Sequence, residues 1–271
     1  MEAFRRVDVT RVRDGQRAIG GDHVATEEPL EIRLSGRPFA VIMRTPGADR
    51  ELAAGFLLAE QVLTQPDDLG TIEYCTDQKA EHPENIVNVT LANRSPEAVD
   101  KLLAGRRQVT TNSSCGLCGR QTIESLRSDA PALCERWTIA ASMLSELPDR
   151  LRAAQSVFDQ TGGLHAAGLF VRDGRLEGVA EDVGRHNAVD KVIGRMLMQE
   201  RLPLSEHLLF VSGRTSFEIV QKAFLAGIPM VGSVSAPSSL AIELAVESGV
   251  TLVGFVRGQS FNVYAHPARI A

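Results

Sequence analysis

The second half of the chain alternates short apolar runs with segments of helical periodicity, and this pattern limits the possible folds more than any other feature. The apolar runs HLLFVS, IPMVGSVS and VTLVGFVR are separated by TSFEIVQKAFLAG and APSSLAIELAVESG. Continuous apolar runs are typical of parallel strands covered on both faces by helices. The pattern predicts an α/β fold, specifically a three-layer αβα sandwich with a partly parallel sheet.

The residues before these runs extend the same unit. A helix is predicted over 145–161, followed by the strands LHAAGLFV and LEGVAE and by the helix NAVDKVIGRMLMQ, with Asn187 as its N-cap. The complete order, α-β-β-α-β-α-β-α-β, is similar to that of the cytidine deaminase-like fold. A likeness of fold assigns no function by itself.

The first half predicts a smaller α+β domain. EEPLEIRLSGRPFAVIMRTPG indicates a β-hairpin, and ADRELAAGFLLAEQVL places Leu52, Phe56, Ala59 and Leu63 on one helical face. NIVNVTL indicates a strand, and Ser95 is the expected N-cap of the helix in SPEAVDKLLAG. We therefore expect an N-terminal domain over residues 1–140 and an α/β domain over residues 141–271.

Composition excludes several classes of protein. The chain has 271 residues, 44% of them hydrophobic, so we expect it to bury a large core. It has only four cysteines, so we expect no disulfide scaffold and a location in the reducing cytoplasm. No apolar run approaches the roughly 20 residues of a membrane span. The net charge of -5 disfavours a general nucleic-acid binder. Small molecules and other proteins are the expected partners.

The segment TTNSSCGLCGR contains a C-x-x-C pair, Cys115 and Cys118, just before a predicted helix. Helix amides and Arg120 favour a thiolate there, which suits zinc binding, disulfide exchange or sulfur transfer. A structural zinc site needs two more ligands, but Cys75 and Cys134 form no second C-x-x-C. Cys134 has apolar neighbours and is expected to be a buried, inert cysteine.

Zinc-dependent base deamination is a further possibility because of the predicted fold. That chemistry uses H-x-E followed by P-C-x-x-C. In this chain GGLHAAG has Ala167 where the glutamate is needed, and the histidine follows the cysteines instead of preceding them. The sequence therefore opposes a deaminase-like hydrolase.

Polar turns follow several of the predicted strands. Arg185 and His186 precede a helix in AEDVGRHNAVDKVIG, and VSGRTSFE and VSAPSSLA each open another helix. Such turns share one sheet edge, where ligands commonly bind and where helix N-termini attract anions. Arg214 and Arg257 add guanidinium groups at this edge. Capping by Ser and Gly is the structural alternative, and His186 and His165 are equally compatible with structural roles.

Several segments together resemble one known family, the formate dehydrogenase accessory sulfurtransferases (FdhD). They are EEPLEIRLSGRPFAVIMRTPGADRELAAGFLLAE, SSCGLCGR, TGGLHAAGLF, EDVGRHNAVDKVIG, SGRTSFEIVQKAFLAGIPMVGSVSAPSSLA and GFVRGQSFNVYAHPARI. The resemblance implies a cytoplasmic, homodimeric protein that takes persulfide sulfur from a cysteine desulfurase. It delivers this sulfur to the molybdenum cofactor, as formate dehydrogenase activity requires.

The resemblance also implies roles for individual residues. Cys115 corresponds to the persulfide carrier, with Cys118 as its partner, and no resident metal is expected. The implied ligand is the molybdenum bis(molybdopterin guanine dinucleotide) cofactor, which GDP-like nucleotides would mimic. The cofactor stretch of the family falls on Phe255, Val256, Arg257, Gly258, Gln259 and Ser260. From the polar-turn argument we add Ser212, Gly213 and Arg214.

One rival function remains open beside sulfur transfer. The chain could be a zinc-stabilised binding module that escorts the cofactor or the dehydrogenase without covalent chemistry.

Overall fold

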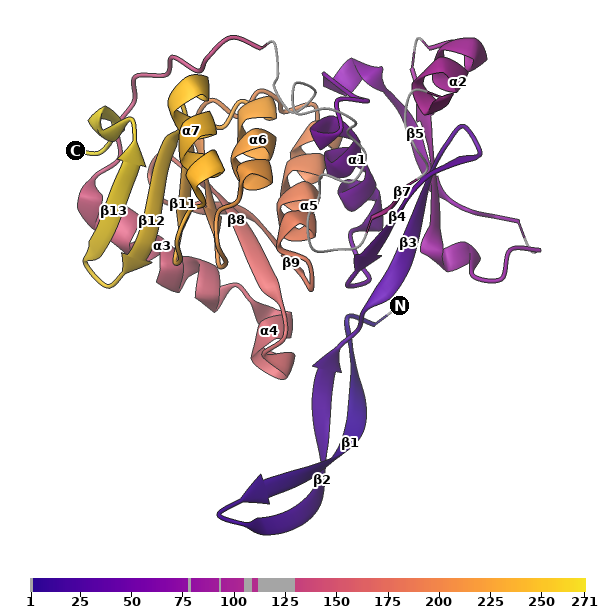
Figure 1. Ribbon diagram of the computed structural model, residues 1–271, viewed down its shortest axis with the longest axis horizontal. Helices are drawn as coiled ribbons and strands as arrows, with labels where there is room; N and C mark the ends of the chain where they lie inside the picture. The colour runs from indigo at the N-terminus through magenta and orange to yellow at the C-terminus, as the bar shows by residue number, and fades with distance from the viewer. Residues whose placement is uncertain (1, 78, 93, 105–108, 112–129) are drawn as a thin grey trace.

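The computed structural model describes residues 2–77, 79–92, 94–104, 109–111 and 130–271 (Figure 1). They form two α/β units and a projecting β-hairpin. The strands and helices are, in chain order, β1 (Phe4–Arg13), β2 (Gln16–Ala25), β3 (Glu28–Leu34), β4 (Arg37–Arg44), α1 (Asp49–Ala59), β5 (Leu69–Tyr74), β6 (Ile86–Leu91), α2 (Pro96–Ala104), β7 (Val109–Thr111), α3 (Ala141–Ala153), α4 (Ser156–Thr161), β8 (His165–Val171), β9 (Leu176–Asp182), α5 (Arg185–Met198), β10 (His207–Val211), α6 (Phe217–Leu225), β11 (Met230–Ser233), α7 (Ser239–Ser248), β12 (Thr251–Arg257) and β13 (Ser260–Ala265).

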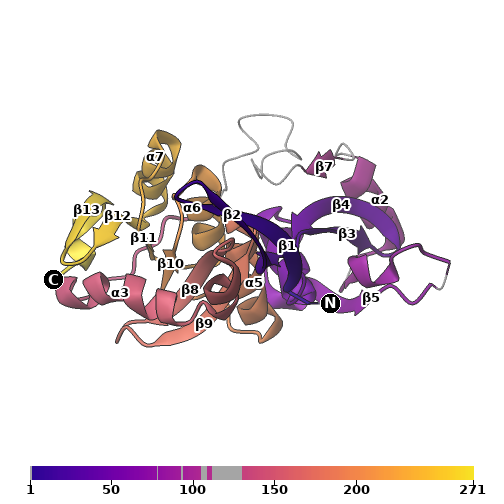
Figure 2. The same cartoon turned by 90° about the horizontal axis from the view of Figure 1, so that it is seen from below.

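The C-terminal unit is built on a six-stranded sheet in the order β13-β12-β11-β10-β8-β9. Strands β10, β11 and β12 are parallel, as their continuous apolar runs predict, whereas β13 pairs antiparallel with β12 and was not predicted. Helix α3 lies on one face of the sheet and helices α6 and α7 lie on the other (Figure 2). The expected three layers are present; the closer likeness to the cytidine deaminase-like fold stays a prediction.

The N-terminal unit has a five-stranded sheet in the order β5-β6-β3-β4-β7. Strands β3 and β4 form the predicted antiparallel hairpin, and the Ser95 hydroxyl accepts the Ala98 amide at 3.3 Å at the start of α2, as expected of an N-cap. The described residues from 130 onward attach to the C-terminal unit, because the Leu133 amide donates to the Ser248 carbonyl at 2.8 Å. A domain boundary at residue 140 stays a prediction.

Two helices differ from their predicted lengths. The helix expected over 145–161 is divided into α3 and α4, because the carboxylate of Glu181 accepts the amides of Val157 and Phe158 and starts a new helix there. Helix α1 ends at Ala59, before the expected Leu63, because Gln61 adopts a left-handed conformation with φ 56°. Leu63 is nevertheless fully buried.

The hairpin of β1 and β2 was not predicted. It forms a two-stranded sheet of its own that projects below the body in Figure 1. Most of its side chains are exposed, so its sequence lacks the apolar alternation of a half-buried strand. Among the residues that the structure describes, no helix is long and apolar enough to cross a membrane.

Helices α1 and α5 bring the two units into contact at a pair of glycines. A methyl group at Gly194 would overlap the carbonyl oxygen of Glu51, and one at Gly55 would overlap the carbonyl of Asp190. Only glycine permits such close approach of two helix backbones. Apolar residues of both units join one continuous core around this crossing.

We expect Gly194→Ala to destabilise the protein. Helix propensity alone would stabilise it by up to about 1 kcal/mol, but the added methyl group must push α1 away from α5, at a typical overpacking cost of about 1–3 kcal/mol. Urea unfolding of the wild type and the variant measures the difference. Gly163→Ala is the control, because its new methyl group would come no closer than 3.6 Å to any neighbouring atom, an ordinary van der Waals contact. An equal or higher stability of Gly194→Ala would contradict this account.

Candidate functional site

The turns that follow β10, β11 and β12 form a continuous surface at one edge of the C-terminal sheet. The Thr215 amide donates to the Ala236 carbonyl at 3.2 Å, and the Ser238 amide donates back to the Thr215 carbonyl at 3.0 Å. The Phe255 amide donates to the Ser235 carbonyl at 3.1 Å. The prediction that these turns share an edge is therefore confirmed; in Figure 1 the turn between β12 and β13 marks the lower side, toward which the β1–β2 hairpin projects.

Phe255 is held in a strained conformation at this edge. Its φ of 54° is left-handed, and the β12–β13 register shifts between Gly254 and Arg257. Phe255 is 37% exposed, and the Arg257 guanidinium lies 5.7 Å from the centroid of its ring. The Arg257 Nε donates to the Val234 carbonyl at 3.1 Å, which orients the guanidinium. Backbone strain in a bulky exposed residue is typical of ligand sites.

Other residues of the expected cofactor stretch stabilise the core and the turn between β12 and β13. Val256 is fully buried in the core on the α3 side of the sheet, so its side chain does not reach the edge. The Ser260 hydroxyl donates to the Arg257 carbonyl at 3.1 Å and closes the turn, in which Gly258 has φ 56° and Gln259 is exposed.

The turn after β10 likewise contains both a residue with a structural role and a residue with a free side chain. The Ser212 hydroxyl accepts the Ala166 amide at 2.8 Å and joins β10 to β8. Arg214 is exposed and has no hydrogen bond or ion pair with any residue in the described ranges. The exposed side chains of this predicted set therefore include those of Phe255, Arg257, Gln259 and Arg214.

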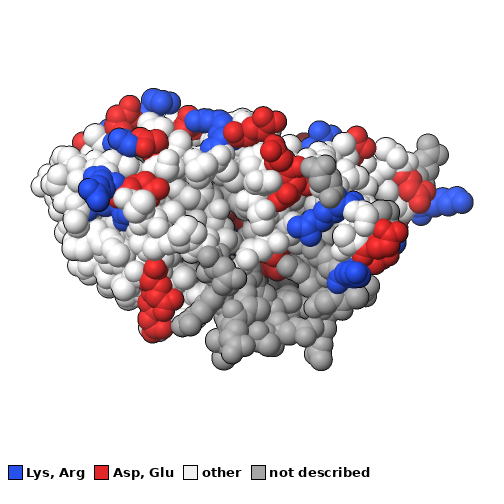
Figure 3. Space-filling view, turned by 90° about the horizontal axis from the view of Figure 1, so that it is seen from above, with Lys and Arg blue, Asp and Glu red and all other residues white. Residues whose placement is uncertain are grey.

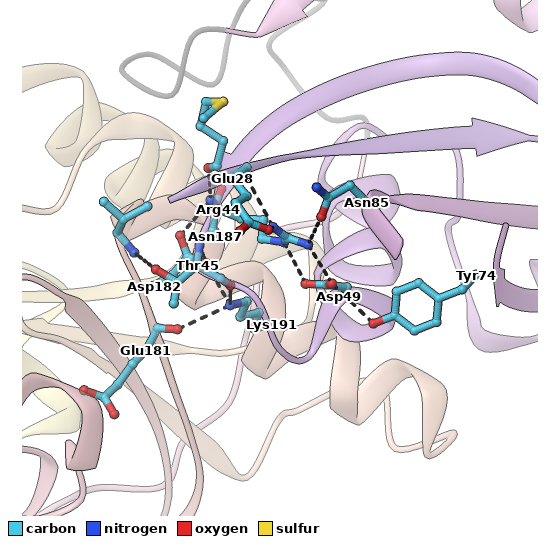
Figure 4. A network of polar contacts seen from close by, with 12 residues as sticks. Glu28, Arg44, Thr45, Asp49, Tyr74, Asn85, Glu181, Asp182, Asn187 and Lys191 are labelled. Carbon is cyan, nitrogen blue, oxygen red and sulfur yellow. Dashed lines mark hydrogen bonds and ion pairs between the residues drawn. The ribbon is translucent and has the colours of Figure 1, made fainter. Parts of the chain in front are cut away.

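The turn after β9 serves mainly to join the two units (Figure 4). The buried Asp182 carboxylate accepts the Thr45 amide at 3.1 Å and the Asn187 side-chain amide at 2.8 Å, and it pairs with Lys191 at 2.7 Å. Asn187 is therefore not the N-cap of α5; Gly184 is. Asn187 also binds the Met43 carbonyl at 2.8 Å, a contact with the N-terminal unit that no local sequence signal indicated.

His186 is engaged inside the protein. Its Nε2 lies 3.0 Å from the Ser216 hydroxyl and 3.0 Å from the Glu218 carboxylate. Burial alone would raise the pKa of Glu218, but the hydrogen bond and charge of His186 outweigh it and lower that pKa below its ordinary value. One helical turn further on, Lys222 pairs with the buried Asp190 at 2.5 Å. Helices α5 and α6 are thus joined by two buried polar contacts.

His165 and Arg185 meet beside Gly213. A Cβ added to Gly213 would lie 3.3 Å from Nδ1 of His165 and 3.8 Å from Cδ of Arg185. Burial, followed by the charge of Arg185, lowers the pKa of His165 below its ordinary value. His165, whose pKa is lowered, and the guanidinium-bearing Arg185 therefore both lie beside the turn after β10.

These residues could hold an anionic group. Arg185 Nε is enclosed and lacks a hydrogen-bond partner, and Arg257 and Arg214 add positive charge at the same edge. Figure 3 shows the opposite face of the molecule, seen from above, where acidic and basic side chains are interspersed. At the candidate edge, the guanidinium groups of Arg185, Arg214 and Arg257 would supply the attraction for phosphate groups.

Only two of the four cysteines, Cys75 and Cys134, lie in the described residues. Cys115 and Cys118 lie outside the described residues. Cys134 is exposed, so the expectation that it is buried is wrong; its neighbour Leu133 packs against the core instead. Within the described residues, no group of three or more His, Cys, Asp or Glu side chains is placed to hold a metal ion.

Comparison with known proteins finds similarity over the full chain. A model of the FdhD/NarQ family matches residues 25–271. The sulfur carrier protein FdhD of Streptomyces avermitilis is 53% identical, covering 98% of this chain and 95% of the relative. That of Sulfolobus acidocaldarius is 47% identical, covering 98% of both. A crystal structure assigned to a formate dehydrogenase accessory protein from Desulfotalea psychrophila has a TM-score of 0.77 and 27% identity, covering 100% of both chains.

The family match and the identities to full-length relatives agree with one another, and the solved structure shows the same overall arrangement of both units. On these grounds, the chain belongs to the FdhD/NarQ family.

Proposed function

We propose that this protein is a sulfurtransferase of the cytoplasm that carries sulfur during the maturation of formate dehydrogenase. It accepts sulfur from a cysteine desulfurase on Cys115 and delivers it to the molybdenum bis(molybdopterin guanine dinucleotide) cofactor. The observation that carries this proposal is the similarity over 98% of the chain to relatives named sulfur carrier proteins. The accessory role named for the solved relative supports formate dehydrogenase as the destination.

The first step is a thiolate exchange. The Cys115 thiolate attacks the outer sulfur of the donor's cysteine persulfide. The donor S–S bond breaks, its electron pair leaves with the donor thiolate, and a persulfide forms on Cys115. No net oxidation occurs, so the step needs no further reactant.

Cys118 gives the second step its electrons. Its thiolate attacks the inner sulfur of the Cys115 persulfide, a Cys115–Cys118 disulfide forms, and the outer sulfur leaves as sulfide toward the substrate cofactor. The two thiols are oxidised and the sulfane sulfur is reduced, which balances the exchange. The C-x-x-C spacing supports this proposal, because residues at that spacing form disulfides in redox proteins.

The edge described above supplies the docking surface in this proposal. Arg257 and Arg214 hold phosphate groups of the cofactor, and the exposed Phe255 ring offers an aromatic surface for a guanine base. Thr111 of β7 pairs with Ile42 of the parallel strand β4. Strand β4 leads directly to Thr45, whose amide binds Asp182. Thr111 is the last described residue before the cysteines and lies on a strand directed toward this edge. A homodimer, as the family resemblance implies, is part of the proposal.

Persulfide formation is the primary test. After incubation with a cysteine desulfurase and cysteine, the wild type should gain the mass of one sulfur atom in a non-reducing intact-mass measurement. Cys115→Ser should gain none, because it removes the attacking thiolate. Cys118→Ser should gain sulfur but release little sulfide afterwards. Sulfur gained by Cys115→Ser would overturn the assignment, and stoichiometric zinc with no persulfide would favour the escort alternative.

Cofactor docking is tested separately with GDP. Arg257→Ala should weaken GDP binding about tenfold or more in calorimetry, because a charge-assisted contact to phosphate is lost. Arg175→Ala, on the exposed turn between β8 and β9 at the opposite sheet edge, is the control and should bind GDP like the wild type. Equal affinity of Arg257→Ala and the wild type would remove Arg257 from the site.

A further inference from the structure

The β1–β2 hairpin stands apart from the rest of the structure. Its two strands of ten residues form a sheet of their own, and the hairpin projects below the body (Figure 1). At its base, a Cβ added to Gly163 would lie 3.6 Å from the Cβ of Ala25. A two-stranded ribbon is only marginally stable in water by itself. The outer part of this hairpin is therefore stabilised when another surface covers it.

The outer half of the hairpin has one face that is apolar and basic. Thr10 pairs with Ile19 and Val12 pairs with Arg17, so these four side chains lie on the same face, here called the tip face. Ile19 is 88% exposed and Val12 is 61% exposed, more than any other large hydrophobic residue that the structure describes. Arg17 is exposed and has no hydrogen bond or ion pair with a described residue. The tip face thus offers two apolar side chains beside an unpaired cation.

Helix α7 offers a surface with the complementary charge. Leu240, Glu243 and Val246 recur at a spacing of three along the helix and form its outer side, here called the α7 face. Leu240 is 43% exposed and Val246 is 55% exposed. Glu243 between them is exposed and has no hydrogen bond or ion pair in the described ranges. The α7 face thus offers two apolar side chains beside an unpaired carboxylate.

The two faces of one chain lie far from each other. In Figure 1 the hairpin projects below the body, whereas α7 lies in the upper part of the C-terminal unit. The hairpin, residues 4–25, contains five arginines and three aspartates and so has a net charge of +2. Since the whole chain has a net charge of -5, the rest of it has a net charge of -7. A hairpin is therefore attracted to the body of a second copy of the chain.

The size of the hairpin is suited to a dimer contact. A ribbon with ten residues in each strand is about 33 Å long and, with its side chains, about 10 Å wide, so one face covers roughly 330 Å². In a reciprocal dimer each copy contributes one hairpin and receives another. This doubles the area to roughly 660 Å² on each partner, close to the roughly 800 Å² of a standard stable interface.

We propose that the tip face of each hairpin binds the α7 face of a second copy of this chain, in a reciprocal homodimer. The apolar side chains of the two faces pack together, and Arg17 of one copy pairs with Glu243 of the other. The inference rests on the homodimer of the proposed function and identifies the surfaces that form it. It involves neither the cysteines nor the ligand edge.

Sedimentation equilibrium of the full chain tests the apolar part of the contact. The wild type should have twice the 29.3 kDa mass of one chain at micromolar concentration. Ile19→Asp should weaken the dimer about tenfold or more, because it removes an apolar contact and places an acid next to Glu243. Ile19 is too exposed for this change to unfold the monomer. Ala18→Asp, at the next position on the opposite face of the hairpin, is the matched control and should dimerise like the wild type.

An exchange of charges tests whether α7 is the partner surface. Arg17→Glu and Glu243→Arg should each weaken the dimer about tenfold, because each places two like charges opposite one another. The double variant should regain most of the affinity of the wild type, since the pair is restored with its charges reversed. Both residues are exposed and have no partner among the described residues, so the fold of each copy should be unaffected.

The outcomes separate this inference from the proposed function. If Ile19→Asp dimerises as tightly as Ala18→Asp, the tip face is not in the interface. If the double variant is no tighter than the two single variants, α7 is not the partner surface; in both cases the proposed contact is wrong, while a homodimer through another face stands. If the wild type is a monomer, the homodimer and this contact both fail, and the persulfide measurement on Cys115 still judges sulfur carriage independently.

Discussion

The buried carboxylate of Asp182 is the contact on which the rest of the arrangement depends. It ends β9, binds the Gly184 amide at the start of α5, and accepts the Thr45 amide from the N-terminal unit. A fully buried carboxylate is tolerated only when its oxygens are hydrogen-bonded and its charge is paired, and Lys191 supplies the pair. The glycine crossing of α1 and α5 adds close backbone packing to this polar contact. Together they set the position of the unit that leads to the cysteines relative to the ligand edge.

Because several acidic side chains are used inside the fold, the edge keeps positive charge in a protein whose net charge is -5. Asp182, Glu181 and Glu218 all direct their oxygens into the fold, where they cap helices or join elements. Arg185 and Arg214, from the same turns, keep their charge unpaired. A short segment therefore both holds the two units together and leaves a cation facing the candidate site, without needing a positively charged surface overall.

Local patterns predicted much of this fold because they reflect burial directly. The apolar runs of β10, β11 and β12 indicated parallel covered strands, and the turns after them indicated a shared edge. The β1–β2 hairpin was missed because neither of its faces is well buried, so its sequence carries little apolar alternation. The break between α3 and α4 was missed because the cap that starts α4 comes from Glu181, more than twenty positions away.

The sequence by itself determined the class of fold, the family and the residues from which a site can be built, since these follow from periodicity, turn chemistry and extended similarity. Only the tertiary structure decided which polar residues are free for a ligand. Asn187, expected as a cap, binds Met43 across the unit boundary, and His186 is bound to Glu218, whereas the side chain of Arg185, which directly precedes them, has no partner among the described residues. The reason is distance along the chain: Asp182 and Thr45 are 137 positions apart, and no local pattern reports which groups such a contact consumes.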